Sequence, residues 1–188
     1  MIEFRASPEE RIQQGDIVRN VEYLERIVTY DNGMLEIDKI VFPSVFVLTQ
    51  DCDLQQGIQS QNKEDDKQKN ALIISVLVAP MYNSEHFRLG EHLEYLNAKT
   101  QTYPSSRTNW KSIIQNSNPR YHFLEFGADI PLVNSIIDFK QYFSVSLKTI
   151  QDNKSGGFVG SVGDLYREDV CQRFSAYLSR IGLPNPTV

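Results

Sequence analysis

The sequence has little of what marks disulfide-rich, zinc-binding or membrane-spanning proteins. Only two cysteines occur in 188 residues, Cys52 and Cys171, and they form no Cys-x-x-Cys pair and no Cys/His cluster. This spacing predicts neither a disulfide framework nor a zinc module, and free thiols favour a reducing compartment. No apolar run reaches the length of a membrane span, and the N-terminus has no apolar segment behind a basic start. We therefore expect a soluble, cytoplasmic protein.

Positive charge and common catalytic motifs are also scarce. The formal net charge is −5 and the sequence pI is about 5.2, which argues against a general polyanion-binding surface and leaves room only for a local basic patch. The chain has no Gly-x-Ser-x-Gly, no P-loop, no Gly-x-Gly-x-x-Gly after a strand and no His-Glu-x-x-His. The sequence therefore assigns no catalytic residue, and we expect no metal and no cofactor.

Two apolar runs dominate the part of the chain between Pro43 and Pro80. Residues 45–49 and 71–79 are rich in Val, Ile and Leu, and they are bounded by proline and polar clusters. Continuous β-branched runs of this kind predict strands that are buried on both faces. Pro43 is expected to open the first strand, and one helical turn is expected over 51–57.

Turn and capping signals divide the rest of the first half. Ser7, Pro8 and the two glutamates that follow predict a short N-terminal helix that ends near Gly15. Residues 15–18 and 21–30 are expected to form a strand, and Asp31-Asn32-Gly33 is a strong hairpin signal that predicts a return strand over 34–42. Residues 59–70 have no apolar side chain, which predicts a mobile loop.

The second half contains shorter elements and one clear helix. Helical segments are expected at 83–88, 91–96 and 108–115, with Thr108 as a cap, and strands at 119–126 and 136–147, the latter bent near its middle. A helix over 164–181 is indicated by an apolar stripe, a stop at Gly182 and a proline at 184. Its stripe consists of Leu165, Val170, Phe174, Tyr177, Leu178 and Ile181, and its charged residues Arg167, Glu168, Arg173 and Arg180 are expected to face away.

The most concentrated polar group beside a buried strand is Gln50-Asp51-Cys52-Asp53. The two carboxylates could hold a metal, act as acid and base, or flank a reactive thiol, and Asp16 is the expected companion. They could equally cap the following turn while Cys52 fills an apolar gap. A nucleophilic Cys52 is disfavoured because flanking carboxylates raise the pKa of a thiol.

The three histidines show no metal-binding spacing. His86 and His92 are six residues apart, so they do not share one helical face as a pair at i and i+4 would. His122 lies in an alternating segment and is expected to point to solvent. Each histidine is interpreted as a lone surface or core residue.

The order of segments over roughly residues 12–82 resembles the PemK/MazF-type toxin family. The likeness lies in Gly15-Asp16-Ile17-Val18, a hairpin, Pro43 before an apolar strand ending Thr49-Gln50-Asp51, and then Leu77-Val78-Ala79-Pro80. The resemblance implies a small SH3-like barrel, RNA as the substrate class, no metal and an antitoxin partner. In that family an Arg before the Pro and a Thr after Ala-Pro-Ile are credited with RNA cleavage. Here those positions hold Phe42 and Tyr82, which argues against cleavage by the family's route.

The whole chain also resembles a bacterial family without an assigned activity. It shares a strand end here read Thr49-Gln50-Asp51-Cys52-Asp53-Leu54 and a tail here read Arg180-Ile181-Gly182-Leu183-Pro184.

We predict one α+β domain over residues 1–188. It is expected to be an antiparallel SH3-like small β-barrel (core about 15–80 and 120–147) with extra strands and a packed C-terminal helix. The expected function is a noncatalytic interaction or regulatory module of a bacterial toxin–antitoxin or phage-defence locus. A protein encoded nearby is the expected partner, and RNA and a second copy of the chain are further candidates. The alternative is an RNA-binding or RNA-cleaving toxin that uses other residues.

Overall fold

The computed structural model describes residues 3–6, 11–61, 71–130 and 132–180. Its strands are β1 (Phe4–Arg5), β2 (Asp16–Thr29), β3 (Leu35–Val47), β4 (Ser75–Asn83), β5 (Tyr121–Leu124), β6 (Ser135–Asp138), β7 (Phe143–Ser146) and β8 (Phe158–Val162). Its α-helices are α1 (Asp51–Gln61), α2 (Ser84–Leu89), α3 (Thr108–Ile114), α4 (Leu147–Gly157) and α5 (Asp164–Leu178), and two 3₁₀ turns are η2 (Glu94–Leu96) and η3 (Phe139–Gln141).

All strand pairings in the sheet are antiparallel. The strand order is β1-β8-β2-β3-β4-β6-β5, and β7 pairs separately with β4. The α+β class with an antiparallel sheet is therefore confirmed. The order has two ends, at β1 and β5, and the sheet is not closed into a barrel among the described residues. The SH3-like barrel stays a prediction.

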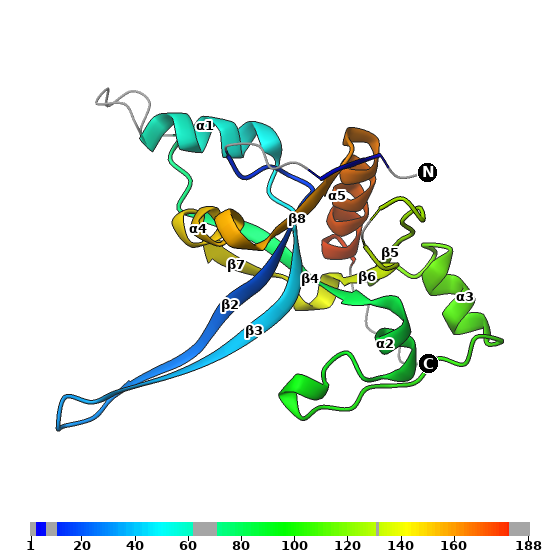
Figure 1. Cartoon of the computed structure of the whole chain (residues 1–188), viewed down its shortest axis with the longest axis horizontal. Helices are drawn as coiled ribbons and strands as arrows, with labels where there is room; N and C mark the ends of the chain where they lie inside the picture. The colour runs from blue at the N-terminus through cyan, green and yellow to red at the C-terminus, as the bar shows by residue number, and fades with distance from the viewer. Residues whose placement is uncertain (1–2, 7–10, 62–70, 131, 181–188) are drawn as a thin grey trace, which may run out of the picture.

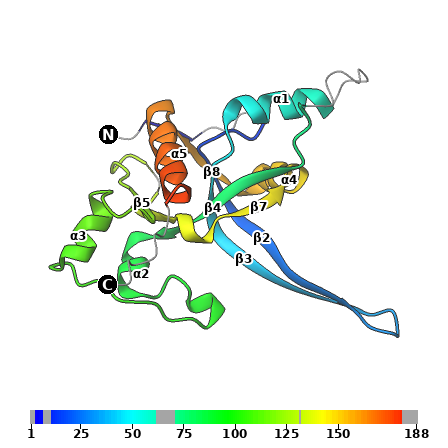
Figure 2. The same cartoon turned by 180° about the vertical axis from the view of Figure 1, so that it is seen from behind.

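The hairpin predicted from Asp31-Asn32-Gly33 is confirmed. β2 and β3 pair from Ile17↔Phe46 to Thr29↔Leu35, and Gly33 has the positive φ of 79° that such a turn requires. The distal half of this hairpin extends away from the rest of the molecule as a two-stranded arm (Figures 1 and 2). Pro43 lies inside β3 instead of opening it, so that expectation is wrong. Proline has no N–H to donate to the neighbouring strand. Pro43 lies opposite Asn20, where the regular pairing is interrupted because Asn20 has a left-handed φ of 56°.

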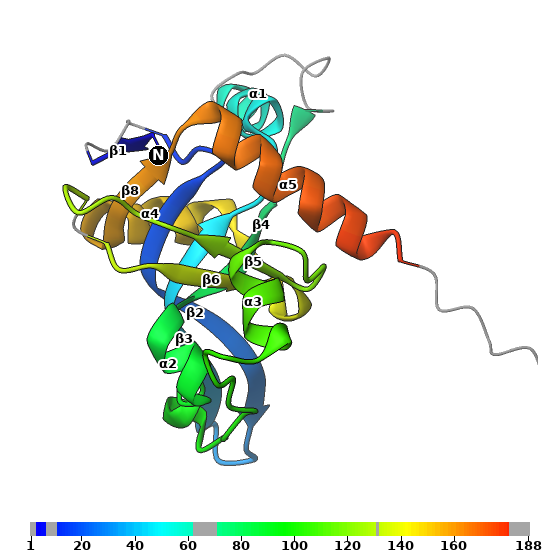
Figure 3. The same ribbon diagram turned by 90° about the vertical axis from the view of Figure 1, so that its right-hand side faces the viewer.

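The three central strands separate two hydrophobic clusters. Ile17, Phe46 and Ala79 lie in one cluster, which α5 covers with Val170 and Phe174 (Figure 3). The alternate residues of the same strands lie in the other cluster, together with Leu54 of α1 and Ile150 of α4 (strand members: Val18, Val45, Val47, Val76 and Val78). The prediction of strands buried on both faces is confirmed for residues 45–47 and 76–79. It is wrong for residues 71–74, which precede β4 and in which Leu72 and Ile74 are 52% and 78% exposed.

Several expectations in the first half were wrong. The predicted N-terminal helix is not present in the described part of residues 1–14. Phe4–Arg5 is a strand paired with β8, residues 11–13 are irregular, and Gln14 and Gly15 form a turn; residues 1–2 and 7–10 lie outside the described residues. The single turn after the strand is an 11-residue helix, α1, which includes residues 59–61 of the predicted mobile loop. Residues 62–70 of that loop lie outside the described residues.

The second half follows the predictions more closely. The bent strand is two strands, β6 and β7, separated by η3, and the helices at 83–88 and 108–115 are α2 and α3. Residues 91–96 contain only the η2 turn, and Thr108 lies inside α3, which has no side-chain cap. The helix α4 and the strand β8 were not predicted, because the polar sequence of α4 offers only Leu147 and Ile150 as buried apolar anchors.

The C-terminal helix is confirmed, but its buried face is rotated from the predicted one. Leu165 is 85% exposed, whereas Val170 and Phe174 are buried with Tyr166 and Tyr177 packed beside them. Residues 181–188, with the predicted stop signals, lie outside the described residues.

Arg173 also departs from the prediction, since it faces inward. Its guanidinium donates hydrogen bonds to the backbone carbonyls of Asn116, Asn118 and Tyr121. An inward arginine is stable here because those carbonyls give it hydrogen-bond acceptors at a loop end.

Gly160 permits the contact that attaches β1 to the sheet. A Cβ at this position would lie 1.8 Å from the Phe4 ring, whereas a Cβ at Gly156 in α4 would meet nothing within 4 Å. We predict that Gly160→Ala lowers the free energy of unfolding by about 1–3 kcal/mol because the Phe4 ring must leave its place. The matched variant Gly156→Ala should raise it by up to about 1 kcal/mol. Urea unfolding of the two variants checks this, and equal midpoints would show that Phe4 does not pack on Gly160.

Candidate functional site

The predicted site residues lie where β2 begins and β3 ends. Because these strands are antiparallel neighbours, the Gly15 N–H donates to the Val47 carbonyl at 3.0 Å, and Asp16 comes to the same end of the sheet as Gln50–Asp53. The segment 11–14 lies between the two groups and contacts both. The structure therefore brings Asp16 and Asp51 into one network, as companions on either side of this segment.

Asp51 is held by Arg11. The two guanidinium nitrogens of Arg11 donate to the two carboxylate oxygens of Asp51 at 2.9 and 2.7 Å. This bidentate ion pair lowers the pKa of Asp51, because the guanidinium stabilises the charged form. No backbone N–H of α1 donates to the carboxylate of Asp51 or Asp53 among the described residues, so the capping interpretation is wrong.

Asp16 is a buried carboxylate with a buried cationic partner. Lys154 of α4 donates to Asp16 Oδ2 at 2.8 Å and also donates to the Arg11 carbonyl, and both side chains are inaccessible or nearly so. The Gln13 N–H donates to the same carboxylate oxygen at 2.9 Å, and Arg5 lies 3.6 Å from the other. A charge this deep needs such partners, since desolvation otherwise opposes burial.

The two cysteines have different surroundings. Cys52 is exposed, with Gln50 Oε1 and Asp53 Oδ1 each 3.8 Å from its sulfur. Cys171 is half-buried in α5, where Gln14 donates to its sulfur at 2.9 Å, and burial raises the pKa of its thiol. An activated nucleophile requires a stabilised thiolate, and burial disfavours the thiolate of Cys171. No group of three His, Cys, Asp or Glu side chains in the described part of the chain could hold a metal ion.

The charged residues at the predicted strand end therefore mainly hold segments of the chain together. The network consists of two ion-paired groups, Arg5–Asp16–Lys154 and Arg11–Asp51, joined by the hydrogen bond from Lys154 to the Arg11 carbonyl. Together they connect the N-terminal segment, β2, α1 and α4. The charges of the network are satisfied mainly by one another. Of the predicted site residues, Gln50, Cys52 and Asp53 are exposed to solvent beside this network.

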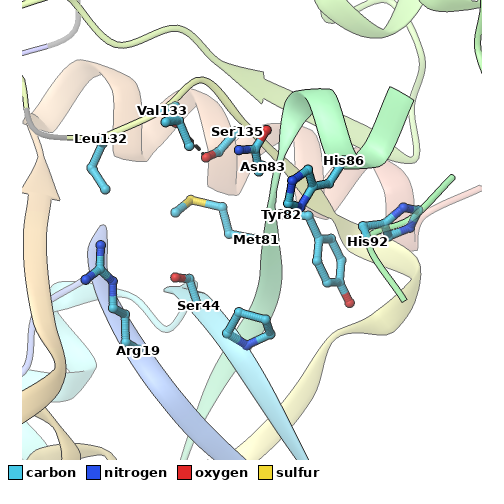
Figure 4. Close-up of a pocket in the computed structure, with 11 residues that line it drawn as sticks. Arg19, Ser44, Met81, Tyr82, Asn83, His86, His92, Leu132, Val133 and Ser135 are labelled. Atoms are coloured by element: carbon cyan, nitrogen blue, oxygen red, sulfur yellow. Dashed lines mark hydrogen bonds between the residues drawn. The ribbon is translucent and has the colours of Figure 1, made fainter. Parts of the chain in front are cut away.

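A second feature was not predicted, which is a pocket at the base of the arm. It has a volume of about 280 Å³, and its lining comes from five separate parts of the chain: Arg19, Pro43, Ser44, Met81, Tyr82, Asn83, His86, His92, Leu132, Val133 and Ser135 (Figure 4). The β2–β3 and β3–β4 pairings and the start of α2 bring these residues together. No local sequence signal could have identified a lining assembled by pairing of distant segments.

The pocket contains both histidines that the sequence failed to connect. His86 lies at the exposed end, and His92 is buried against the rings of Phe87 and Tyr82, with centroids 4.4 and 4.9 Å away. Burial lowers the pKa of His92 to about 4, so its imidazole is neutral at pH 7. Arg19 supplies a permanent positive charge to the pocket, and it has no ion-pair partner among the described residues.

The two positions credited with catalysis in PemK/MazF-type toxins are buried aromatic residues here. Phe42 stacks on Phe143 with ring centroids 4.8 Å apart and is 6% exposed. The Tyr82 hydroxyl donates to Gln141 at 2.8 Å, and burial raises the pKa of Tyr82. Neither side chain offers a cation or a ready proton acceptor to a phosphate.

The arm carries a third feature, an apolar surface on the face opposite to that of Tyr23 and Phe42, which pack on Phe143. Strand alternation and the pairing register place five exposed aliphatic side chains on this face: Leu24, Ile27, Leu35, Ile37 and Val41. We refer to these five as the aliphatic arm face. Glu22 and Lys39, which lie on the same face, form an ion pair at 2.5 Å, so the face is electrically neutral.

Comparison with protein-family models finds no match, and comparison with curated proteins finds no significant similarity. No helix in the described part of the chain is long and apolar enough to cross a membrane.

The buried pair of Asp16 and Lys154 makes a prediction about stability. We expect Asp16→Asn and Lys154→Met each to lower the free energy of unfolding by about 3–5 kcal/mol, because each leaves the partner charge buried and alone. The double variant should lose about 1–3 kcal/mol less than the sum of the two. Denaturant unfolding of all four proteins measures this coupling. Strict additivity would show that the two charges do not interact.

His122 makes a prediction about pH. It is 3% exposed, contrary to the expectation that it points to solvent, and burial next to Arg173 lowers its pKa to about 3. The unfolded chain, with an ordinary histidine pKa near 6.5, then binds this proton first. The stability that neutral His122 provides is present above pH 6.5 and is lost as the pH falls from about 6.5 towards 3.

Urea unfolding at pH 7 and pH 5 isolates the contribution of His122. Relative to His122→Gln, the native chain should lose about 2 kcal/mol more over this interval. His86→Gln, which replaces an exposed histidine, is measured alongside as the matched control. A His122→Gln protein with the native pH dependence would contradict the burial argument.

Proposed function

We propose that this chain is a noncatalytic interaction module of a bacterial toxin–antitoxin or phage-defence locus. The observation that carries the proposal is the aliphatic arm face. Large exposed apolar surfaces on a protein commonly mark the places where another molecule binds. The setting of the locus and a cytoplasmic location are part of the same proposal, and they follow from the resemblance to PemK/MazF-type toxins.

No further strand in the described chain pairs with the distal part of the arm. β8 pairs with β2 only over Asp16–Val18, and β4 pairs with β3 only over Val45–Val47. Beyond these points the two strands hydrogen-bond only with each other within the described chain. A two-stranded ribbon of this kind is marginally stable in water by itself, and a partner packed on its apolar face would stabilise it.

The charges of the arm indicate the chemistry of the partner. Residues 22–39 contain five acidic and two basic side chains: Glu22, Glu25, Asp31, Glu36 and Asp38 against Arg26 and Lys39. An apolar protein surface with a basic rim would complement both the aliphatic arm face and its acidic surroundings. Two arms of the same charge, or an arm and RNA, would repel each other. A protein partner encoded nearby therefore fits better than a second copy of the chain.

The barrel expectation belongs to this proposal as well. β2, the hairpin, β3 and β4 follow in the order that the resemblance implies, with Val45 paired to Pro80. The small-barrel description would apply to this core of strands, with β5–β8 as additions.

One observation favours an alternative, an RNA-binding or RNA-cleaving toxin. Arg19 and His86 line the same pocket, and a cation beside an imidazole is a combination that can act on a phosphodiester. We rank this alternative second for two reasons. Phe42 and Tyr82 are buried and offer no catalytic group, and the acidic arm would repel RNA.

The arm predicts the outcome of a binding experiment. The doubly substituted protein Ile27→Lys, Ile37→Lys should bind its partner at least tenfold more weakly, because two cations replace apolar contacts and face a basic rim. Each protein encoded next to this chain is co-expressed with it, and the affinity of any complex is measured by calorimetry. Both substituted side chains are exposed, so the melting temperature should change little.

The control substitution is Val28→Lys, which lies on the opposite face of the arm, across from Glu36. It should leave binding intact. A complex that survives Ile27→Lys, Ile37→Lys would overturn the assignment of the surface. Sedimentation at micromolar concentration tests for a second copy as the occupant, and cleavage of mixed single-stranded RNAs in EDTA would replace the proposal by the toxin alternative.

A further inference from the structure

The pocket at the base of the arm has an apolar floor and a polar rim. Met81, Leu132, Val133 and Pro43 supply the apolar surface, and the polar groups lie around it (Figure 4). A volume of about 280 Å³ is close to the lower end of the range for small-molecule sites. Apolar walls with a few polar groups at fixed positions are the usual composition of such sites.

Besides the imidazole of His86, three hydrogen-bond donors of the rim have no acceptor among the described residues. These are the Arg19 guanidinium, the Ser44 hydroxyl and the Asn83 amide N–H group. The Asn83 side chain is oriented, because its Oδ1 accepts the Glu85 N–H at 2.8 Å at the start of α2, which leaves the amide nitrogen for other partners. The Ser135 hydroxyl differs from these three, since it donates to the Val133 carbonyl at 2.8 Å.

The charge of the pocket is positive although the protein is acidic. None of the described lining residues is Asp or Glu, whereas the whole chain has 24 of them and a net charge of −5. His92 is neutral at pH 7, since burial lowers its pKa to about 4. One guanidinium with neutral donors around it matches a ligand with one negative charge.

We propose that this pocket binds a small organic carboxylate, with the carboxylate on Arg19 and an apolar body over Met81 and Leu132. The planar guanidinium can donate two parallel hydrogen bonds to the two carboxylate oxygens. A phosphate dianion would leave one charge without a cation, and it has no apolar part for the floor. The site is separate from the aliphatic arm face, and the proposal does not depend on the proposed function.

Hexanoate is a suitable probe because it combines one carboxylate with a flexible apolar chain. Titration into ¹⁵N-labelled protein, followed by NMR chemical shifts, should give saturable binding with the largest changes at the pocket residues. Hexanamide, which has the same shape without the charge, should bind at least tenfold more weakly, as expected when a charged hydrogen bond is lost.

Substitutions distinguish the pocket from nonspecific binding. Arg19→Gln should weaken hexanoate about tenfold to a hundredfold, and Ser44→Ala about fivefold, in line with the loss of a charged and a neutral hydrogen bond. Arg26→Gln is the matched control on the same strand, because Arg26 pairs with Asp38 outside the pocket. It should leave the affinity unchanged.

The proposal fails if hexanoate binds Arg19→Gln as tightly as the native protein, or if hexanamide binds as well as hexanoate. Inorganic phosphate and a short single-stranded RNA are titrated in parallel. Arg19-dependent binding of either one without binding of hexanoate would overturn the carboxylate assignment. These measurements do not involve the arm, so a negative result for the pocket does not affect the proposal of a protein partner. A negative result for the partner likewise does not affect the pocket proposal.

Discussion

Three residues of β3 hold the two halves of the structure together. Val45, Phe46 and Val47 pair with β4 on one edge, and Val45 and Phe46 also pair with β2 on the other. Their side chains alternate between the two hydrophobic clusters and are fully buried on both faces. The helices α1, α4 and α5 have a surface to pack on because these strands are apolar on both sides. A polar residue at any of the three positions would face a core in which it finds no partner.

The arm begins where this double-sided burial of β2 and β3 ends. Where β4 and β8 stop pairing, β2 and β3 continue as a ribbon whose outer face is largely exposed to solvent. The inner face is covered only near the base, where Tyr23 and Phe42 contact Phe143. Five aliphatic side chains then remain exposed, in a chain whose other apolar strands are buried on both faces. That contrast makes the arm the natural place for a partner.

Charged groups are used in two different ways. In the ion-pair network at the N-terminal end of β2, Asp16 and Lys154 are buried and directly paired, and Arg11 holds Asp51 through two hydrogen bonds. These charges connect segments of the chain to one another. Arg19, only three residues after Asp16, has no such partner in the described chain and lines a pocket without carboxylates. A fully paired charge contributes to the fold, whereas an unpaired one at a pocket is available to a ligand.

Local patterns in the sequence determined the hairpin, the doubly buried strands, the α+β class and the C-terminal helix. Each depends on neighbouring residues, such as Asn32-Gly33 in the turn or the continuous apolar run at the end of β3, which act through backbone conformation and local pattern. The same reasoning identified Asp16 and Gln50–Asp53 as a polar group at one end of the sheet. It did not find Lys154 or Arg11 as their partners, since both lie in segments with no apolar pattern.

Tertiary structure alone decided what surrounds each polar residue. Pairing of β2 with β3 and β3 with β4 places Arg19, Ser44 and Asn83 around one pocket, although they lie up to 64 positions apart in the sequence. The burial of His122 and the inward side of Arg173 likewise depend on how α5 packs against β5 and its neighbouring loop. Sequence periodicity specifies which residues avoid water, but the partner of a charge is set by the register of distant strands, which no local pattern encodes.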